Sequence, residues 1–187
     1  MLVRHIALVR HGKPAGADNP MVSASGFARW ARSYERSRLR SDSTPPSELK
    51  AAFDGYLAVA SPRPRAWHSA EVCLGRGPDL VMVDLREMEI PRYRIPLRLP
   101  AYAWLVINRA LWFAGLPGRC ESFHEARLRA RRVSTELDRL AQSHGRVVVF
   151  GHGLMNQSLA RHLVARGWRG EPRRSGYWDV IDLTSGA

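Results

Sequence analysis

Two histidines follow apolar segments in the same local pattern. Residues 6–9 lead into Arg10-His11-Gly12, and residues 148–150 lead into Gly151-His152-Gly153. Each histidine lies beside glycine just after a run that predicts a buried strand. In open α/β sheets, ligands bind at the carboxyl ends of the strands, where glycine lets the backbone approach an anion. The alternative is a turn with an incidental histidine, because short motifs often match by chance.

These residue types suit phosphoryl chemistry. A neutral imidazole is a nucleophile near pH 7. The guanidinium of Arg10, next to His11, offers paired donors to phosphate oxygens and stays charged. The repetition at two strand ends makes an incidental turn a weaker explanation than it is for either motif alone.

Four short motifs occur in order along the chain: Leu8-Val9-Arg10-His11-Gly12, the run Ser61-Pro62-Arg63-Pro64-Arg65-Ala66 that continues to Ser69-Ala70, Leu85-Arg86-Glu87, and Gly151-His152-Gly153. Together they resemble the signature motifs of the histidine phosphatase superfamily, which includes the cofactor-dependent phosphoglycerate mutases. A weaker match, Val-Ser-Ala-Ser-Gly at residues 22–26, is similar to the family's helix-opening Leu-Thr-x-x-Gly. Several ordered motifs are far more specific than any one of them.

The resemblance implies a role for each matched residue. His11 attacks the phosphorus and carries the phosphoryl group, while Arg10 and Arg65 bind the phosphate oxygens. His152 binds the phosphate and stabilises charge in the transition state, and Glu87 protonates the leaving oxygen and later activates water. This scheme needs no metal and no cofactor, and the sequence offers no carboxylate cluster for a metal.

Two of these assignments have a close competitor. Arg63 could replace Arg65 as the phosphate ligand, although the Arg-Ala register of the motif favours Arg65. Glu89 lies two residues after Glu87 and would point the same way in an extended segment, so only the Leu-x-Glu context favours Glu87. His68, three residues after Arg65, is a candidate for the pocket rim.

The expected activity is hydrolysis of a phosphomonoester through a phosphohistidine, and phosphoglycerate mutase-type transfer is the alternative. The expected partner is an anionic phosphorylated small molecule, with no nucleic acid and no membrane. A formal net charge of +12 leaves a nucleic-acid-binding or non-catalytic interaction protein as an alternative of another class. However, the arginines are dispersed along the chain, and the proposed catalytic residues are all intact.

Alternating strand and helix patterns predict a three-layer α/β/α sandwich with a mostly parallel sheet, as in phosphoglycerate mutases. We expect one domain over residues 1–187, with an insertion at about 90–118 over one edge of the sheet. Trp104, Trp112 and Phe113 in that insertion form either a pocket cap or, as we favour, packed core. Buried strands are expected at 2–9, 56–60, 80–83 and 146–150, with a possible fifth at 177–183, and helices at 23–40, 63–74, 102–114, 122–143 and 154–165.

Composition favours a cytoplasmic protein. Two scattered cysteines, Cys73 and Cys120, do not form a disulfide framework. Arg4 and His5 interrupt the first apolar run too early for a signal-peptide core. The most apolar later stretch, residues 101–116, contains Asn108 and Arg109 and is too short to span a bilayer.

Overall fold

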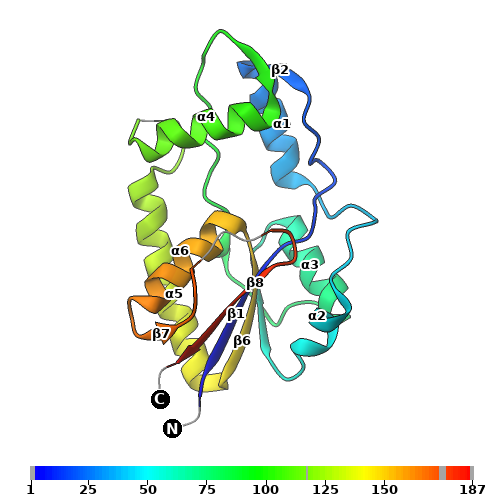
Figure 1. Ribbon diagram of the computed structural model, residues 1–187, viewed down its shortest axis with the longest axis vertical. Coiled ribbons are helices and arrows are strands. Elements are labelled where there is room, and N and C mark those ends of the chain that lie inside the picture. Colours follow the sequence, from blue (N-terminus) through cyan, green and yellow to red (C-terminus); the bar gives the residue numbers. More distant parts are fainter. Residues whose placement is uncertain (1–2, 117, 173–175, 186–187) are drawn as a thin grey trace.

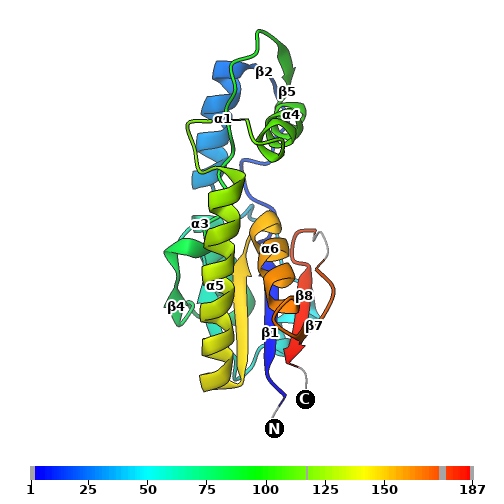
Figure 2. The same ribbon diagram turned by 90° about the vertical axis from the view of Figure 1, so that its left-hand side faces the viewer.

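The computed structural model describes residues 3–116, 118–172 and 176–185, and these ranges form a central sheet covered by helices on both faces (Figures 1 and 2). The sheet has the strand order β4-β3-β6-β1-β8-β7. Strands β4, β3, β6 and β1 are parallel, whereas β8 is antiparallel to both β1 and β7. The predicted α/β/α sandwich with a mostly parallel sheet is confirmed. The strand bounds are β1 (His5–Arg10), β3 (Leu57–Ala60), β4 (Leu80–Val81), β6 (Arg146–Gly151), β7 (Trp168–Arg169) and β8 (Val180–Ser185).

Alternate residues of the central strands supply two separate cores. Ile6 and Leu8 of β1 belong to the core beneath α5 (Phe123–His144) and α6 (Gly153–Val164). Ala7 and Val9 belong to the core on the opposite face, which α2 (Ser47–Ala52) and α3 (Pro64–Leu74) cover. Burial on both faces explains why these strands are uninterrupted apolar runs in the sequence.

Four of the five predicted helices have bounds close to the prediction, and α2 was not predicted. Helices α3, α4 (Ala101–Phe113), α5 and α6 begin and end within one residue of the predicted positions. Helix α1 (Ala24–Arg36) ends before the predicted Arg40, because Ser37 is extended and Leu39 bridges to Pro14. Along the described ranges, no helix combines the length and apolarity that a membrane crossing requires.

The predicted strand at 80–83 is wrong in length and in burial. Only Leu80 and Val81 form strand β4, at the edge of the sheet, and they are 40% and 42% exposed. The chain then enters a short 3-10 helix, η1 (Val83–Leu85). An edge strand has only one neighbouring strand, so its apolar side chains stay partly exposed although the sequence is hydrophobic.

A second, smaller group of elements lies beyond the carboxyl ends of the central strands (Figure 1). Strand β2 (Met21–Ser23) pairs antiparallel with β5 (Arg98–Pro100), beside helices α1 and α4. We call these four elements the cap. Phe27, Ile90 and Trp104 form its buried core, so the segment predicted as an insertion over a sheet edge instead joins α1 above the sheet. Trp104 and Trp112 are buried, as predicted, whereas Phe113 is 43% exposed.

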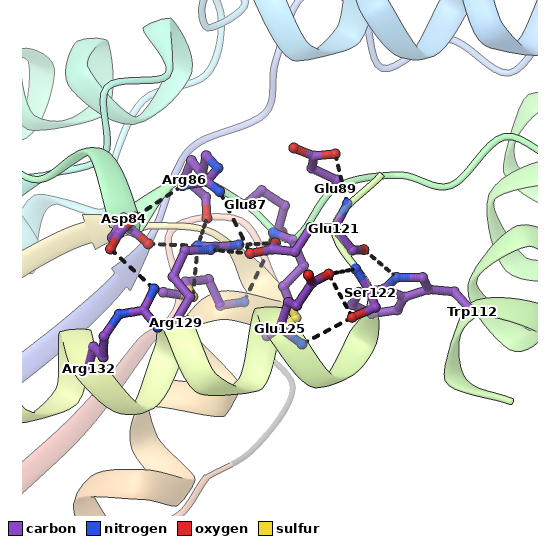
Figure 3. Close-up of polar contacts among 12 residues, drawn as sticks. Asp84, Arg86, Glu87, Glu89, Trp112, Glu121, Ser122, Glu125, Arg129 and Arg132 are labelled. Atoms are coloured by element: carbon purple, nitrogen blue, oxygen red, sulfur yellow. Dashed lines mark hydrogen bonds and ion pairs between the residues drawn. The ribbon is translucent and has the colours of Figure 1, made fainter. Parts of the chain in front are cut away.

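A buried arginine ties α5 to the segment that follows η1 (Figure 3). The Arg129 guanidinium donates to both carboxylate oxygens of Glu121, at 2.7 and 2.6 Å. Its remaining nitrogen donates to the carbonyl oxygens of Asp84 and Arg86, at 2.6 and 2.8 Å. This fork holds the chain just before Glu87, and no sequence motif indicated it.

We predict that Arg129→Met lowers the free energy of unfolding by about 3–5 kcal/mol, because the Glu121 carboxylate and two carbonyl groups lose their hydrogen-bond donor. Arg132→Met is the matched control on the same helix. Arg132 is 66% exposed and lies 3.8 Å from the Asp84 carboxylate, so its loss should cost less than about 1 kcal/mol. Urea unfolding monitored by circular dichroism measures both, and equal losses would contradict the role of Arg129.

Candidate active site

The carboxyl ends of three neighbouring strands bring the sequence motifs together. The backbone N–H of His11, just past β1, donates to the Gly151 carbonyl at the end of β6, at 3.1 Å. The N–H of Ser61, just past β3, donates to the Phe150 carbonyl at 3.0 Å. Because β6 lies between β3 and β1, Ser61, His152 and His11 emerge side by side.

His11 is buried, and both nitrogens of its ring are engaged. Nδ1 lies 2.7 Å from the carbonyl oxygen of Gly12, so Nδ1 carries the hydrogen. Nε2 is therefore the unprotonated nitrogen, and it accepts a hydrogen bond from Arg65 Nε at 3.0 Å. This tautomer leaves the Nε2 lone pair as the nucleophilic one.

A tight approach around Gly12 fixes the loop that carries His11. A Cβ at Gly12 would lie 2.5 Å from ring atoms of Trp178, so a side chain does not fit. The Gly12 N–H donates to the Ser69 hydroxyl at 3.0 Å, and that hydroxyl donates to the Arg65 carbonyl at 2.7 Å. The first two sequence motifs are thus hydrogen-bonded to each other.

Arg65 is a buried cation with neutral partners. Besides His11, its guanidinium donates to the carbonyl oxygens of Tyr34 and Glu35, at 3.3 and 3.1 Å. These carbonyls belong to the last turn of α1, where backbone acceptors lack helical partners and the helix dipole is negative. Within the described ranges, no carboxylate lies within ion-pair distance of it. Arg63, the competing candidate, instead lies 3.8 Å from the Glu35 carboxylate.

His152 lies behind His11, fully buried, with ring centroids 5.1 Å apart. Its Nε2 lies 2.8 Å from the Ser61 hydroxyl, which accepts from the Arg63 N–H at 3.3 Å. The Ser61 hydroxyl can donate to Nε2, and in that tautomer the ring hydrogen is on Nδ1. This Nδ1 has no hydrogen-bond partner among the described residues.

The two candidate acids have different surroundings (Figure 3). Glu87 Oε1 accepts from the backbone N–H of Met88 at 3.0 Å and of Met155 at 3.1 Å, in the first turn of α6. Glu87 also lines the cavity that contains His11. Glu89 instead accepts from the Glu121 N–H at 3.2 Å and is not a lining residue. The segment that carries Glu87 and Glu89 is not a regular extended strand, so their two side chains do not point the same way.

Burial and nearby cations keep both histidines neutral. Burial, followed by the charge of Arg65, holds the pKa of His11 well below its ordinary value of 6.5, although the bond to Gly12 opposes the shift. The pKa of His152 is likewise lowered, first by burial and then by the charge of Arg65. Both rings are therefore uncharged at neutral pH.

A cavity of about 520 Å³ opens above these residues, between the sheet and the cap. Arg10 is at its floor, and its guanidinium lies 4.6 Å from the centroid of the Tyr177 ring. His68 does not line it, so its predicted place at the pocket rim is not found. The lining residues are Arg10, His11, Tyr34, Glu35, Arg63, Arg65, Glu87, Met88, Ile90, Leu105, Val106, Arg109, Ala110, Phe113, Gly153 and Leu154.

Sequence reasoning missed the lining that the cap supplies. Tyr34 comes from α1, and burial raises its pKa above the ordinary value. Arg109 comes from α4 and donates to the carbonyl oxygens of Glu89 and Met88, at 2.7 and 2.6 Å. No local motif marks these residues, because the fold alone brings them to the site. Across the described ranges, no group of three or more histidine, cysteine or carboxylate side chains could hold a metal ion.

Several solved structures share the fold of this chain. One is the product of an open reading frame of Mycobacterium tuberculosis, with a TM-score of 0.64 and 17% identity over 96% of this chain and 90% of that chain. A second is the mycobacterial glucosyl-3-phosphoglycerate phosphatase, with a TM-score of 0.58 and 19% identity over 97% of this chain and 90% of that chain. A third is a phosphoserine phosphatase from Entamoeba histolytica, with a TM-score of 0.61 and 15% identity over 95% of this chain and 89% of that chain. At such identities the likeness shows the fold alone.

The amino-acid sequence itself matches the profile of one protein family. No curated protein matches the chain at a significant level. The family profile of the histidine phosphatase superfamily (branch 1), however, matches residues 6–175. That match contains His11, Arg65 and Glu87, which line one cavity, and His152, which lies buried behind His11. The chain belongs to the histidine phosphatase superfamily.

Proposed function

We propose that this chain is a phosphatase that hydrolyses a phosphomonoester through a phosphohistidine on His11. The observation that carries the proposal is the pairing of His11 with Arg65. The unprotonated Nε2 of a neutral, buried imidazole lies 3.0 Å from Arg65 Nε, at the floor of an open cavity. A nucleophile and an anion-binding group are thus side by side where a phosphate can enter.

In the first step, the His11 Nε2 lone pair attacks phosphorus, and the bond from phosphorus to the ester oxygen breaks. Arg10 and Arg65 bind the phosphate oxygens, and the amino end of α6 adds a favourable dipole. His152 Nδ1 is buried without a described hydrogen-bond partner, and a phosphate oxygen supplies one. Glu87 gives a proton to the departing alcohol.

In the second step, water attacks the phosphohistidine, and the bond from phosphorus to Nε2 breaks. Glu87 takes a proton from the water, which releases inorganic phosphate and restores neutral His11. Its Oε1 is fixed by two backbone donors, so Oε2 serves as the proton-carrying oxygen. No carboxylate cluster for a metal occurs in the described ranges, and the scheme needs no metal.

Similar proteins include phosphatases of small phosphorylated metabolites, by their names glucosyl-3-phosphoglycerate and phosphoserine phosphatases. These names support hydrolysis over transfer, and an anionic phosphorylated small molecule as the partner. A mutase would use the same residues, but it would rest as a phosphoenzyme. The intact mass of the resting enzyme, measured before each assay, shows whether it is phosphorylated.

We predict that His11→Ala lowers the rate of p-nitrophenyl phosphate hydrolysis to less than about a hundredth of wild type, because no other group forms the covalent intermediate. His124→Ala is the control, since His124 is exposed on α5 and far in sequence from the motifs. Circular dichroism verifies that both variants fold. Retention of more than about a hundredth of the rate would contradict the covalent role.

We predict that Glu87→Gln slows phosphorylation of the enzyme by ethyl phosphate about 10²–10⁴-fold and by p-nitrophenyl phosphate far less. An alkoxide must be protonated as it leaves, whereas p-nitrophenolate is a weak base. Single-turnover measurements isolate this step from water attack. Glu89→Gln is the matched control, because Glu89 bonds to the Glu121 N–H outside the cavity.

If Glu89→Gln shows the selective loss and Glu87→Gln does not, the assignment of the acid is reversed. If neither variant shows it, the proton donor is another group, and Glu35, the other carboxylate in the cavity lining, becomes the next candidate.

We predict that stability falls as the pH drops below about 6.5. The unfolded chain binds protons at His11 and His152 there, while the folded protein, whose pKa values are lowered, does not. Each such histidine contributes up to about 1.4 kcal/mol per pH unit. Urea unfolding between pH 5 and 7 should show a shallower slope for His11→Asn than for wild type or His124→Asn. An unchanged slope would mean that His11 is protonated in the folded state.

A further inference from the structure

The cavity above His11 has two chemically different ends. Its floor carries the cations Arg10, Arg63 and Arg65, which suit a phosphate. The wall that α4 supplies is apolar, with Leu105, Val106, Ala110 and Phe113. Met88, Ile90 and Leu154 continue the apolar lining across the cavity. A volume of about 520 Å³ holds far more than a phosphate group.

Several polar groups of the lining already have partners within the protein. The Arg109 guanidinium is bonded to the carbonyl oxygens of Met88 and Glu89. Arg63 lies 3.8 Å from the Glu35 carboxylate, and the Tyr34 hydroxyl is hydrogen-bonded to Tyr177. A sugar rich in hydroxyl groups would therefore leave many of its donors and acceptors unpaired in this cavity.

The apolar wall is one continuous face of α4. Val106, Ala110 and Phe113 are exposed at helical spacing, and Val106 is 67% exposed. From Val106 to Phe113 the face extends about 10 Å along the helix axis, at about 1.5 Å per residue. Phe113 is held in place by Trp112 and Phe123, at ring-centroid distances of 5.3 and 5.1 Å. This wall is preformed.

We propose that the substrate is an amphiphilic phosphomonoester, with its phosphate on Arg10, His11 and Arg65 and a hydrocarbon body along the exposed face of α4. The inference rests on the proposed phosphatase function and names its substrate class. Burial of apolar substrate atoms against an exposed apolar wall supplies binding energy that a polar metabolite would not gain.

The test is a series of n-alkyl phosphates from ethyl to octyl, assayed below their micelle concentrations. The leaving alcohols have similar acidity, so differences in kcat/KM report on chain binding. We expect kcat/KM to rise at least about tenfold across the series, within a ceiling of about fourfold per buried methylene. A flat series, with ethyl phosphate hydrolysed, overturns the inference and leaves the phosphatase function intact.

Two valines of equal exposure give a matched pair of variants. Val106→Asp should lower the octyl-to-ethyl ratio of kcat/KM at least about fivefold, because a carboxylate on the wall opposes burial of the chain. Val83→Asp should leave the ratio unchanged, since Val83 is 66% exposed and lies outside the cavity lining. If circular dichroism shows that Val106→Asp has lost structure, Val106→Ser is used in its place. An unchanged ratio in the folded Val106 variant overturns the inference.

A binding measurement separates failure of the two proposals. Calorimetry with ethylphosphonate and octylphosphonate, which are not hydrolysed, reports on the site without turnover. If no ester is hydrolysed, the phosphatase function fails. In that case at least about tenfold tighter binding of octylphosphonate supports the amphiphile site, and equal Kd values overturn it.

Discussion

The buried guanidinium of Arg65 is the constraint around which the site is organised. A charge removed from water needs compensation, yet its hydrogen-bond partners are two carbonyl oxygens and the neutral ring of His11. Burial and, after it, the positive potential of Arg65 lower the pKa values of His11 and His152. The Arg65 charge also lacks a carboxylate partner among the described residues, and an entering phosphate would supply the negative charge. The same interaction therefore prepares the nucleophile and the binding site for its target.

The hydrogen bonds of Arg65 also connect the layers of the protein. Its partners Tyr34 and Glu35 lie in the last turn of helix α1 of the cap. Arg65 itself lies in the first turn of α3, and His11 directly follows β1. Glu87 is fixed separately, by the first turn of α6 and by the buried Arg129 fork just before it. The cap and the sheet thus meet at the groups that would handle the phosphate. The apolar wall that α4 supplies would then select the organic part of the phosphorylated substrate.

Much of this arrangement could be predicted from the sequence, because strand ends and motif order are local signals. The apolar runs before His11 and Gly151 identified neighbouring strands, and the Arg-Ala register favoured Arg65, the arginine that bonds His11. Pairing of β2 with β5 could not be predicted, since nothing local relates three-residue strands so far apart. Burial of β4 was overestimated because hydrophobicity does not distinguish an edge strand from a central one.

The central claim, attack by Nε2 of His11, is tested most directly by locating phosphorus on the trapped enzyme. Wild-type protein is mixed with substrate, quenched in alkali within milliseconds, and analysed by ³¹P NMR and peptide mass spectrometry. Because Nδ1 is held by the Gly12 carbonyl at 2.7 Å, we expect a single phosphoryl group on Nε2 of His11. Phosphate on Nδ1, on another residue, or on no residue while turnover proceeds, would contradict this account.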